Sequence, residues 1–130
     1  MKGELMAEEQ KFRIPMVKLR NQGFQVSKLG FGCMRLTGIN NIPLYVDVGI
    51  SIVEDAFTKG ITFLDSADVY GPHTNKVLLG KSLKQLPREK IRIATKFGIA
   101  GTRPTGVLVK GTPEYVRSCC EASLKHLDAK

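Results

Sequence analysis

Residues 61–71 have the sequence Ile61-Thr62-Phe63-Leu64-Asp65-Ser66-Ala67-Asp68-Val69-Tyr70-Gly71. A second stretch, residues 91–98, has the sequence Ile91-Arg92-Ile93-Ala94-Thr95-Lys96-Phe97-Gly98. Each is a short run of β-branched and apolar residues that leads to an ionisable residue and then a glycine. This pattern is typical of a buried parallel strand that ends in a functional loop. The two stretches therefore predict an α/β fold with functional side chains at the carboxyl ends of its strands.

Three side chains in these stretches, those of Asp65, Tyr70 and Lys96, suit the reduction of a carbonyl group. That reaction needs a hydride donor and an acid that protonates the developing alkoxide, and a tyrosine with a pKa of about 10 is a poor acid near neutral pH. A neighbouring ammonium such as Lys96 lowers that pKa, and a carboxylate such as Asp65 keeps the lysine charged and in place. Asp65 could instead shape a turn, but its place at the end of an apolar strand favours the functional interpretation.

These residues resemble a known family. Asp65 and Tyr70 within Asp-Ser-Ala-Asp-Val-Tyr-Gly, and Lys96 within Ala-Thr-Lys-Phe-Gly, are similar to three of the four catalytic residues of the aldo-keto reductases. The resemblance extends from about Val17 to the end of the chain, and it is closest to the plant branch described as auxin-induced or perakine-reductase-like. It implies a (β/α)8 barrel enzyme that uses NADPH to reduce an aldehyde or ketone.

The resemblance also implies a set of cofactor residues at the end of a first barrel strand over residues 29–34. Gly32, Cys33 and Met34 would lie beside NADPH, together with Asp65, although Cys33 could equally serve strand packing. His73 is a candidate substrate-side donor, and its alternative is an ordinary exposed loop histidine. No metal site is expected.

The fourth catalytic residue of the family, a histidine, follows the fourth barrel strand, and the 130 residues end where that strand should begin. Neither His73 nor His126 occupies the equivalent position. A closed barrel takes about 250 residues, whereas this chain offers an amino-terminal hairpin and about three βα units. We therefore expect a disordered tail over residues 1–16 and a truncated barrel over residues 17–130, with unpaired edges that favour self-association.

Composition restricts partners and compartment. The net charge of +8 is dispersed, without a basic run or interleaved aromatic residues, so nucleic acid is not an expected partner. Three cysteines, two of them adjacent, do not form a disulfide framework. No signal peptide or membrane-length apolar run is present, and the sequence therefore predicts a cytoplasmic protein without a membrane partner.

Local patterns predict the remaining elements. We expect an antiparallel hairpin around residues 21–23, a helix over residues 48–60, a second helix capped by Thr74, a glycine-rich loop over residues 99–111 and a third helix from Thr112. The third helix should bury a stripe of four side chains, which comprises Val116, Cys120, Leu124 and Leu127. Relatives generally carry a glutamate where Lys76 stands, so Lys76 should weaken the start of the second helix.

Two other functional classes remain open. Potassium-channel β subunits share this barrel and its motifs, which allows a non-catalytic binding or regulatory protein. The chain could also be a truncated product without a function. For the enzyme, the expected partner is a small-molecule carbonyl substrate, and the sequence does not identify this compound.

Overall fold

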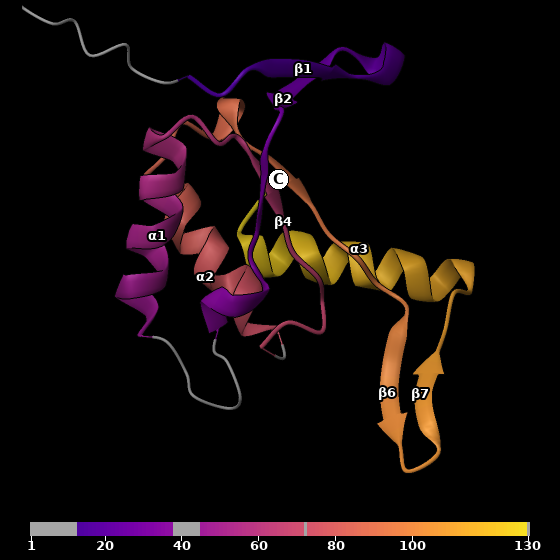
Figure 1. Cartoon of the computed structure of the whole chain (residues 1–130). Helices are drawn as coiled ribbons and strands as arrows, with labels where there is room; N and C mark the ends of the chain where they lie inside the picture. Colours follow the sequence, from indigo (N-terminus) through magenta and orange to yellow (C-terminus); the bar gives the residue numbers. More distant parts are fainter. Residues whose placement is uncertain (1–12, 38–44, 72, 130) are drawn as a thin grey trace, which may run out of the picture.

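The computed structural model describes residues 13–37, 45–71 and 73–129, which form an amino-terminal hairpin and three successive strand–helix units, with a second hairpin inserted between the strand and the helix of the third unit (Figure 1). Residues 1–12, and with them most of the expected tail, lie outside this description. The elements, in chain order, are β1 (Met16–Leu19), η1 (Arg20–Gln22), β2 (Phe24–Ser27), β3 (Gly30–Gly32), η2 (Met34–Thr37), α1 (Val46–Thr58), β4 (Phe63–Asp65), α2 (Thr74–Leu83), η3 (Arg88–Lys90), β5 (Arg92–Ala94), β6 (Ile99–Arg103), β7 (Gly106–Val109) and α3 (Pro113–Leu127).

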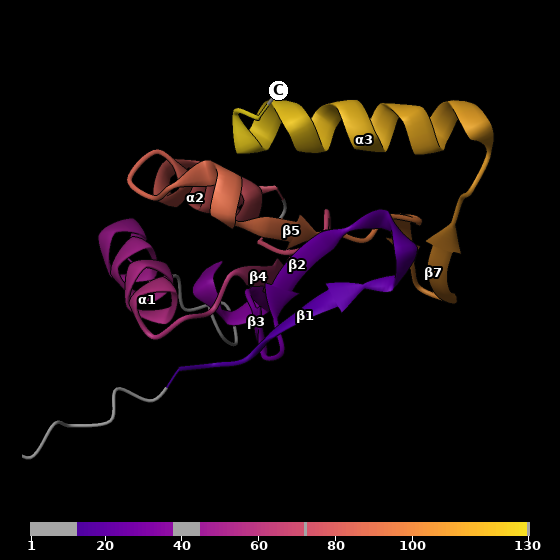
Figure 2. The same ribbon diagram turned by 90° about the horizontal axis from the view of Figure 1, so that it is seen from above.

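A parallel sheet in the order β3-β4-β5 is the centre of the fold. In its register Gly32 pairs with Asp65, and Asp65 pairs with Ala94. The carboxyl ends of all three strands therefore lie side by side, as the sequence predicted. The helices α1, α2 and α3 follow one another along one side of this sheet (Figure 2).

The predicted amino-terminal hairpin is confirmed, with β1 and β2 antiparallel and Val17 opposite Val26. Gly23 closes the turn at a φ of +76°, a conformation that glycine adopts without a Cβ penalty. Ser27 joins the hairpin to the sheet, because its N–H donates to Thr62 Oγ1 at 2.9 Å while the N–H of Thr62 donates to Ser27 Oγ at 2.9 Å. The hairpin thus covers the amino end of the sheet, opposite β6 and β7 (Figure 1).

The core lies between the sheet and the helices, where α2 is the central helix. Its buried residues are Cys33, Leu36, Val53, Leu64, Leu78, Leu79, Leu83, Ile91 and Leu127. Helices α2 and α3 approach closely at Gly80, where an added Cβ would lie 2.8 Å from the carbonyl oxygen of Leu127. Glycine is needed at this position because the neighbouring group is backbone and cannot rotate away.

The predicted stripe on α3 is correct at Leu127 and, in part, at the half-buried Val116, but it is wrong by one position at Cys120 and Leu124. Cys120 is exposed and Leu124 is 42% exposed, whereas Ser123 and Leu127 are buried. The buried face therefore contains a serine, so apolar spacing could not identify it. Thr112 does precede the helix and Pro113 does begin it, but the structure gives Thr112 no capping hydrogen bond from its side chain.

Three further boundaries differ from the sequence prediction. Residues 99–111 are largely an antiparallel hairpin, β6–β7, rather than a loop, because the β-branched and apolar residues 107–109 pair with residues 99–102. The first barrel strand ends at Gly32, and Met34 begins η2. Thr74 is the first residue of α2 rather than its cap, since its hydroxyl donates to the carbonyl of Gly71 and His73 occupies the N-cap position.

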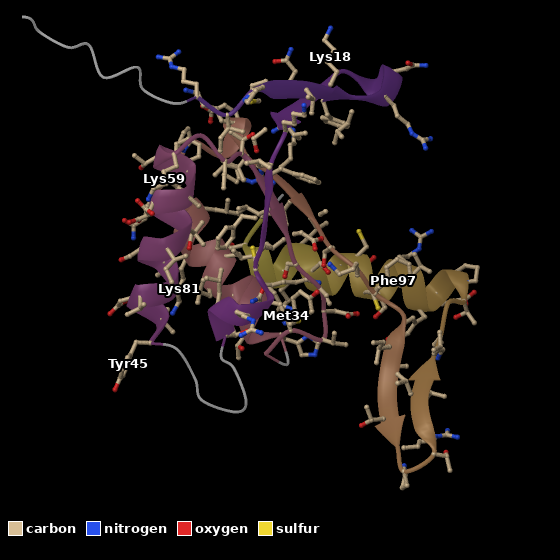
Figure 3. All side chains as sticks on the ribbon, in the orientation of Figure 1. Lys18, Met34, Tyr45, Lys59, Lys81 and Phe97 are labelled. Atoms are coloured by element: carbon tan, nitrogen blue, oxygen red, sulfur yellow. The ribbon has the colours of Figure 1, made fainter. Side chains whose placement is uncertain are left out.

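Positive charge is spread over the surface. The labelled lysines Lys18, Lys59 and Lys81 project from separate elements (Figure 3).

Candidate active site

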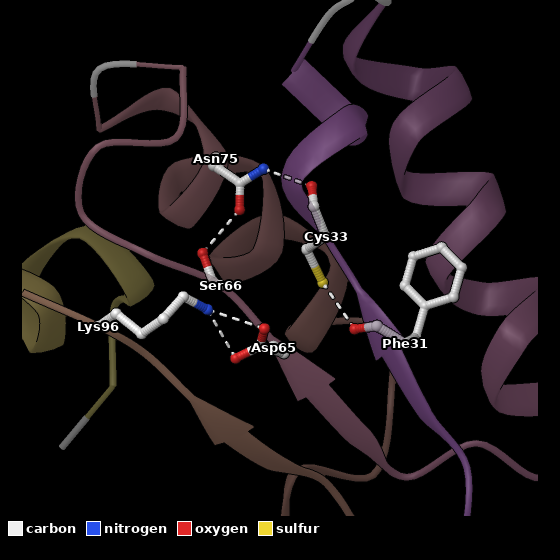
Figure 4. Close-up of polar contacts among 6 residues, drawn as sticks. All are labelled: Phe31, Cys33, Asp65, Ser66, Asn75 and Lys96. Carbon is white, nitrogen blue, oxygen red and sulfur yellow. Dashed lines mark hydrogen bonds and ion pairs between the residues drawn. The ribbon is translucent and has the colours of Figure 1, made fainter.

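Asp65, Tyr70 and Lys96 lie together at the carboxyl end of the parallel sheet. Asp65 is the last residue of β4, and Lys96 follows β5 by two residues. The ammonium of Lys96 donates to both oxygens of Asp65, at 2.9 Å to Oδ1 and 2.8 Å to Oδ2 (Figure 4). The same Nζ atom lies 5.2 Å from the centroid of the Tyr70 ring. One cation thus contacts the carboxylate and the aromatic ring of the other two candidates.

The Lys96–Asp65 pair contributes little to stability. The two side chains are 52% and 49% exposed, and exposed ion pairs are worth only about 0–1 kcal/mol. The hydrogen bonds that the Lys96 ammonium donates to the Asp65 carboxylate raise the pKa of Lys96, with a smaller contribution in the same direction from Tyr70 and an opposing one from partial burial. Lys96 therefore carries its charge at neutral pH, held against Asp65 and beside Tyr70.

The three predicted cofactor residues lie at the end of β3, where their exposures differ. Gly32 is exposed with open space on its Cβ side, and Met34 is 54% exposed. Cys33 is fully buried, which raises the pKa of its thiol to about 12 and leaves it neutral. The side chain of Cys33 thus packs in the core, while its N–H donates to the carbonyl of Asp65 at 2.8 Å. Contact of these residues with a cofactor stays a prediction.

His73 does not join the Asp65 cluster. It precedes α2 at a φ of +67°, and its ring lies 5.0 Å from that of His126. Both imidazoles line a cavity of about 440 Å³ between α2, α3 and β6, which none of Asp65, Tyr70 and Lys96 lines. A substrate role for His73 stays a prediction, and its surroundings differ from those of the three clustered residues.

Lys76 occupies a place that the sequence did not predict. It is 1% exposed, and its ammonium donates to Ser123 Oγ at 2.6 Å, while Ser123 Oγ donates to the carbonyl of Cys119 at 2.7 Å. Burial lowers the pKa of Lys76, and Asp68 partly offsets this effect. The sequence predicted an effect of the Lys76 charge on the start of α2 but not the burial of this side chain. The effect on the stability of the helix start stays a prediction.

Two kinds of feature are not found in residues 13–37, 45–71 and 73–129. These residues form no group of three or more histidine, cysteine, aspartate or glutamate side chains that could hold a metal ion. Nor does any of their helices combine the length and the apolar character needed to cross a membrane.

Acid should loosen the contact between α2 and α3 through His126. Burial is the largest of the effects that lower the pKa of His126. The nearby charges of His73, Lys76 and Lys125 act in the same direction. Asp68 is an acidic residue that lines the same cavity. Because the folded pKa lies below the ordinary value of about 6.5, the unfolded chain takes up the proton first. The free energy of unfolding should therefore fall as pH decreases below about 6.5.

Urea denaturation of the wild type and of His126→Gln at several pH values between 5 and 8 measures this effect. The variant should lose less stability than the wild type over that range. Parallel stability profiles for the two proteins would show that His126 does not contribute.

Comparison with known proteins identifies the family and the fold. The sequence model of the Aldo/keto reductase family matches residues 28–130. The protein "Probable aldo-keto reductase 1" of Glycine max is 62% identical over 118 residues, which cover 91% of this chain and 34% of that protein. The chain thus spans about a third of the length of this relative.

Solved structures show the same fold. The aldo-keto reductase AKR11C1 of Bacillus halodurans, in its holo form, superposes with a TM-score of 0.75 at 29% identity, over 89% of this chain and 37% of that one. The thermostable aldo-keto reductase Tm1743, solved with the inhibitor epalrestat, gives a TM-score of 0.71 at 25% identity, and the match covers 88% of this chain and 39% of that one. The fold is therefore part of the (β/α)8 barrel that the sequence predicted. With a family match over most of its length, the chain belongs to the aldo/keto reductase family.

Proposed function

We propose that this chain supplies the Asp–Tyr–Lys part of an active site that reduces an aldehyde or ketone to an alcohol with NADPH. The observation that carries the proposal is the position of the Lys96 ammonium, 2.8–2.9 Å from both oxygens of Asp65 and 5.2 Å from the centre of the Tyr70 ring. A fixed cation beside a phenol is the arrangement that prepares the phenol to transfer a proton.

Each side chain has one role in this proposal. Tyr70 donates its hydroxyl proton to the carbonyl oxygen of the substrate. Lys96 stabilises the negative charge left on Tyr70, and Asp65 holds Lys96 in place. Bound NADPH supplies the hydride that the carbonyl carbon receives. The half-exposed positions of Asp65 and Lys96 leave this edge of the sheet open to a substrate.

The end of β3 fits the reactive end of the cofactor. Gly32 has no atom within 4 Å of the place where a Cβ would stand, so a flat ring can approach the backbone there. Met34 and Asp65 flank this opening with exposed or half-exposed side chains. The net charge of +8 favours the approach of a phosphate-bearing ligand. The three cysteines among the described residues are free, which supports a reducing compartment such as the cytoplasm.

The chain alone should bind NADPH weakly or not at all. It spans about a third of the Glycine max relative, and affinity for an extended cofactor depends on many contacts made together. Isothermal titration calorimetry with NADPH should detect no micromolar binding, with NADH as the comparison ligand. Micromolar affinity would mean that these residues already contain most of the cofactor site.

The proposed activity is best tested in a chimera in which this chain replaces the matching 118 residues of the Glycine max protein. At 62% identity most contacts between the exchanged part and the remainder should persist. We expect NADPH oxidation in the presence of an aldehyde or ketone. A folded chimera that binds NADPH but fails to oxidise it would favour a non-catalytic binding function instead.

A further inference from the structure

Asn75 is a fully buried side chain that touches none of the three candidate catalytic side chains directly. It is 0% exposed and lies in the first turn of α2. Its Nδ2 donates to the carbonyl of Cys33 at 2.7 Å, while Ser66 Oγ donates to its Oδ1 at 2.7 Å (Figure 4). The same Nδ2 also donates to Thr37 Oγ1 at 3.2 Å. All the hydrogen-bonding atoms of this amide are therefore occupied in the protein interior.

The chemistry of the partners fixes the orientation of the amide. A backbone carbonyl only accepts hydrogen bonds, so the group that faces Cys33 must be the NH₂ group. The remaining oxygen then has to accept from Ser66, whose hydroxyl can rotate to donate. Among side chains of this size, an amide offers this donor and this acceptor at every pH, whereas a carboxyl group does so only when it is protonated.

The amide connects the backbone segments that carry the candidate site. Cys33 follows β3, and its N–H donates to the carbonyl of Asp65 at 2.8 Å. Ser66 follows Asp65 directly, and its N–H donates to Ala94 of β5 at 2.9 Å. The backbone N–H of Asn75 also donates to the carbonyl of Tyr70 at 3.4 Å, which closes the loop between β4 and α2.

We propose that Asn75 is a positioning residue, which fixes the ends of β3 and β4 and the Tyr70 loop so that one Lys96 ammonium contacts both Asp65 and Tyr70. Its importance for catalysis rests on the proposed function, but the positioning itself is a property of the chain and can be measured without turnover. The asparagine acts through the backbone on either side of Asp65 and does not contact the reacting atoms.

The resonances of the Lys96 side chain, assigned by their loss in Lys96→Arg, measure the positioning directly by NMR. In Asn75→Ala the titration midpoint of Lys96 should move back toward that of an ordinary exposed lysine, because the Asp65 contact loosens. Ser66→Ala removes one of the three bonds and should cause a smaller shift in the same direction. Ser82→Ala is the matched control, since Ser82 is equally buried in α2 and its hydroxyl donates to the carbonyl of Leu78 in the same helix. It should leave Lys96 unchanged.

Asn75→Asp adds a test by rescue. An ionised carboxylate would face the Cys33 carbonyl and repel it, whereas a protonated one can donate to Cys33 and still accept from Ser66. A buried carboxyl has a raised pKa, so the Lys96 resonances of this variant should approach those of the wild type near pH 5 and depart from them near pH 8.

The proposal is overturned if Lys96 keeps its wild-type resonances and midpoint in folded Asn75→Ala and Ser66→Ala, or if Ser82→Ala moves them equally. Should Asn75→Ala unfold, Ser66→Ala and the acid rescue of Asn75→Asp decide the matter. Because turnover is not the readout, failure here leaves the proposed reductase function intact. Conversely, a chain without reductase activity could still show the positioning.

Discussion

Tyr70→Phe, introduced into the chimera with the Glycine max protein, is expected to lower kcat for carbonyl reduction by a factor of about 10²–10⁴, the usual contribution of a positioned general acid. The Lys96 Nζ atom lies 5.2 Å from the centroid of the Tyr70 ring. Phenylalanine keeps a ring at this place and removes only the hydroxyl group with its transferable proton. NADPH binding should therefore change little. Steady-state kinetics and calorimetry with NADPH separate the two effects.

Tyr115→Phe is the matched control, since Tyr115 is a partly exposed tyrosine on α3 whose hydroxyl donates to Ile99 at 3.4 Å, away from the Asp65 cluster. It should retain nearly full activity. If Tyr70→Phe kept more than about a tenth of kcat, a loss below roughly 1.4 kcal/mol in barrier, Tyr70 would not be the acid and the assignment of the site would fail.

Leu79→Ala is expected to reduce the free energy of unfolding by about 2–5 kcal/mol, the range for truncation of a fully buried leucine. Leu79 is 0% exposed in α2, the helix that contacts both α1 and α3, so the cavity would lie where neighbours on two sides cannot easily close it. Urea denaturation followed by far-ultraviolet circular dichroism measures the change, since the chain contains no tryptophan.

Val77→Ala on the same helix is the control for this substitution, because Val77 is 40% exposed. Its effect should stay within about 0.5 kcal/mol, as for other surface changes. A loss below about 1 kcal/mol for Leu79→Ala would mean that the interior around α2 rearranges freely.

The parts of the fold that the sequence predicted correctly are those governed by local patterns. The apolar runs that lead to Asp65 and Lys96 predicted parallel strands, and parallel strands necessarily place their carboxyl ends together. The resemblance to the family then assigned a role to each residue at that edge. Neither inference required knowledge of which helix packs against which.

Two features were missed because a distant partner decides the structure. The inner face of α3 contains Ser123, which accepts a hydrogen bond from the ammonium of Lys76 of α2, and no periodic apolar signal marks such a position. Asn75 was not singled out in the sequence, because its amide is satisfied by Cys33 and Ser66, which are 42 and 9 residues away. Polar contacts of this kind have no period in the sequence.

The buried bond between Lys76 and Ser123 also has an evolutionary consequence. Replacement of Ser123 alone would leave an ammonium in the interior without its acceptor, which is costly. Replacement of Lys76 alone by glutamate would place a carboxylate where a cation now points. Selection should therefore act on the two positions as a pair, so that homologous chains change them together or keep both. In recombination between family members, a crossover between α2 and α3 would separate the pair and should yield fewer folded progeny than one placed on either side of both helices.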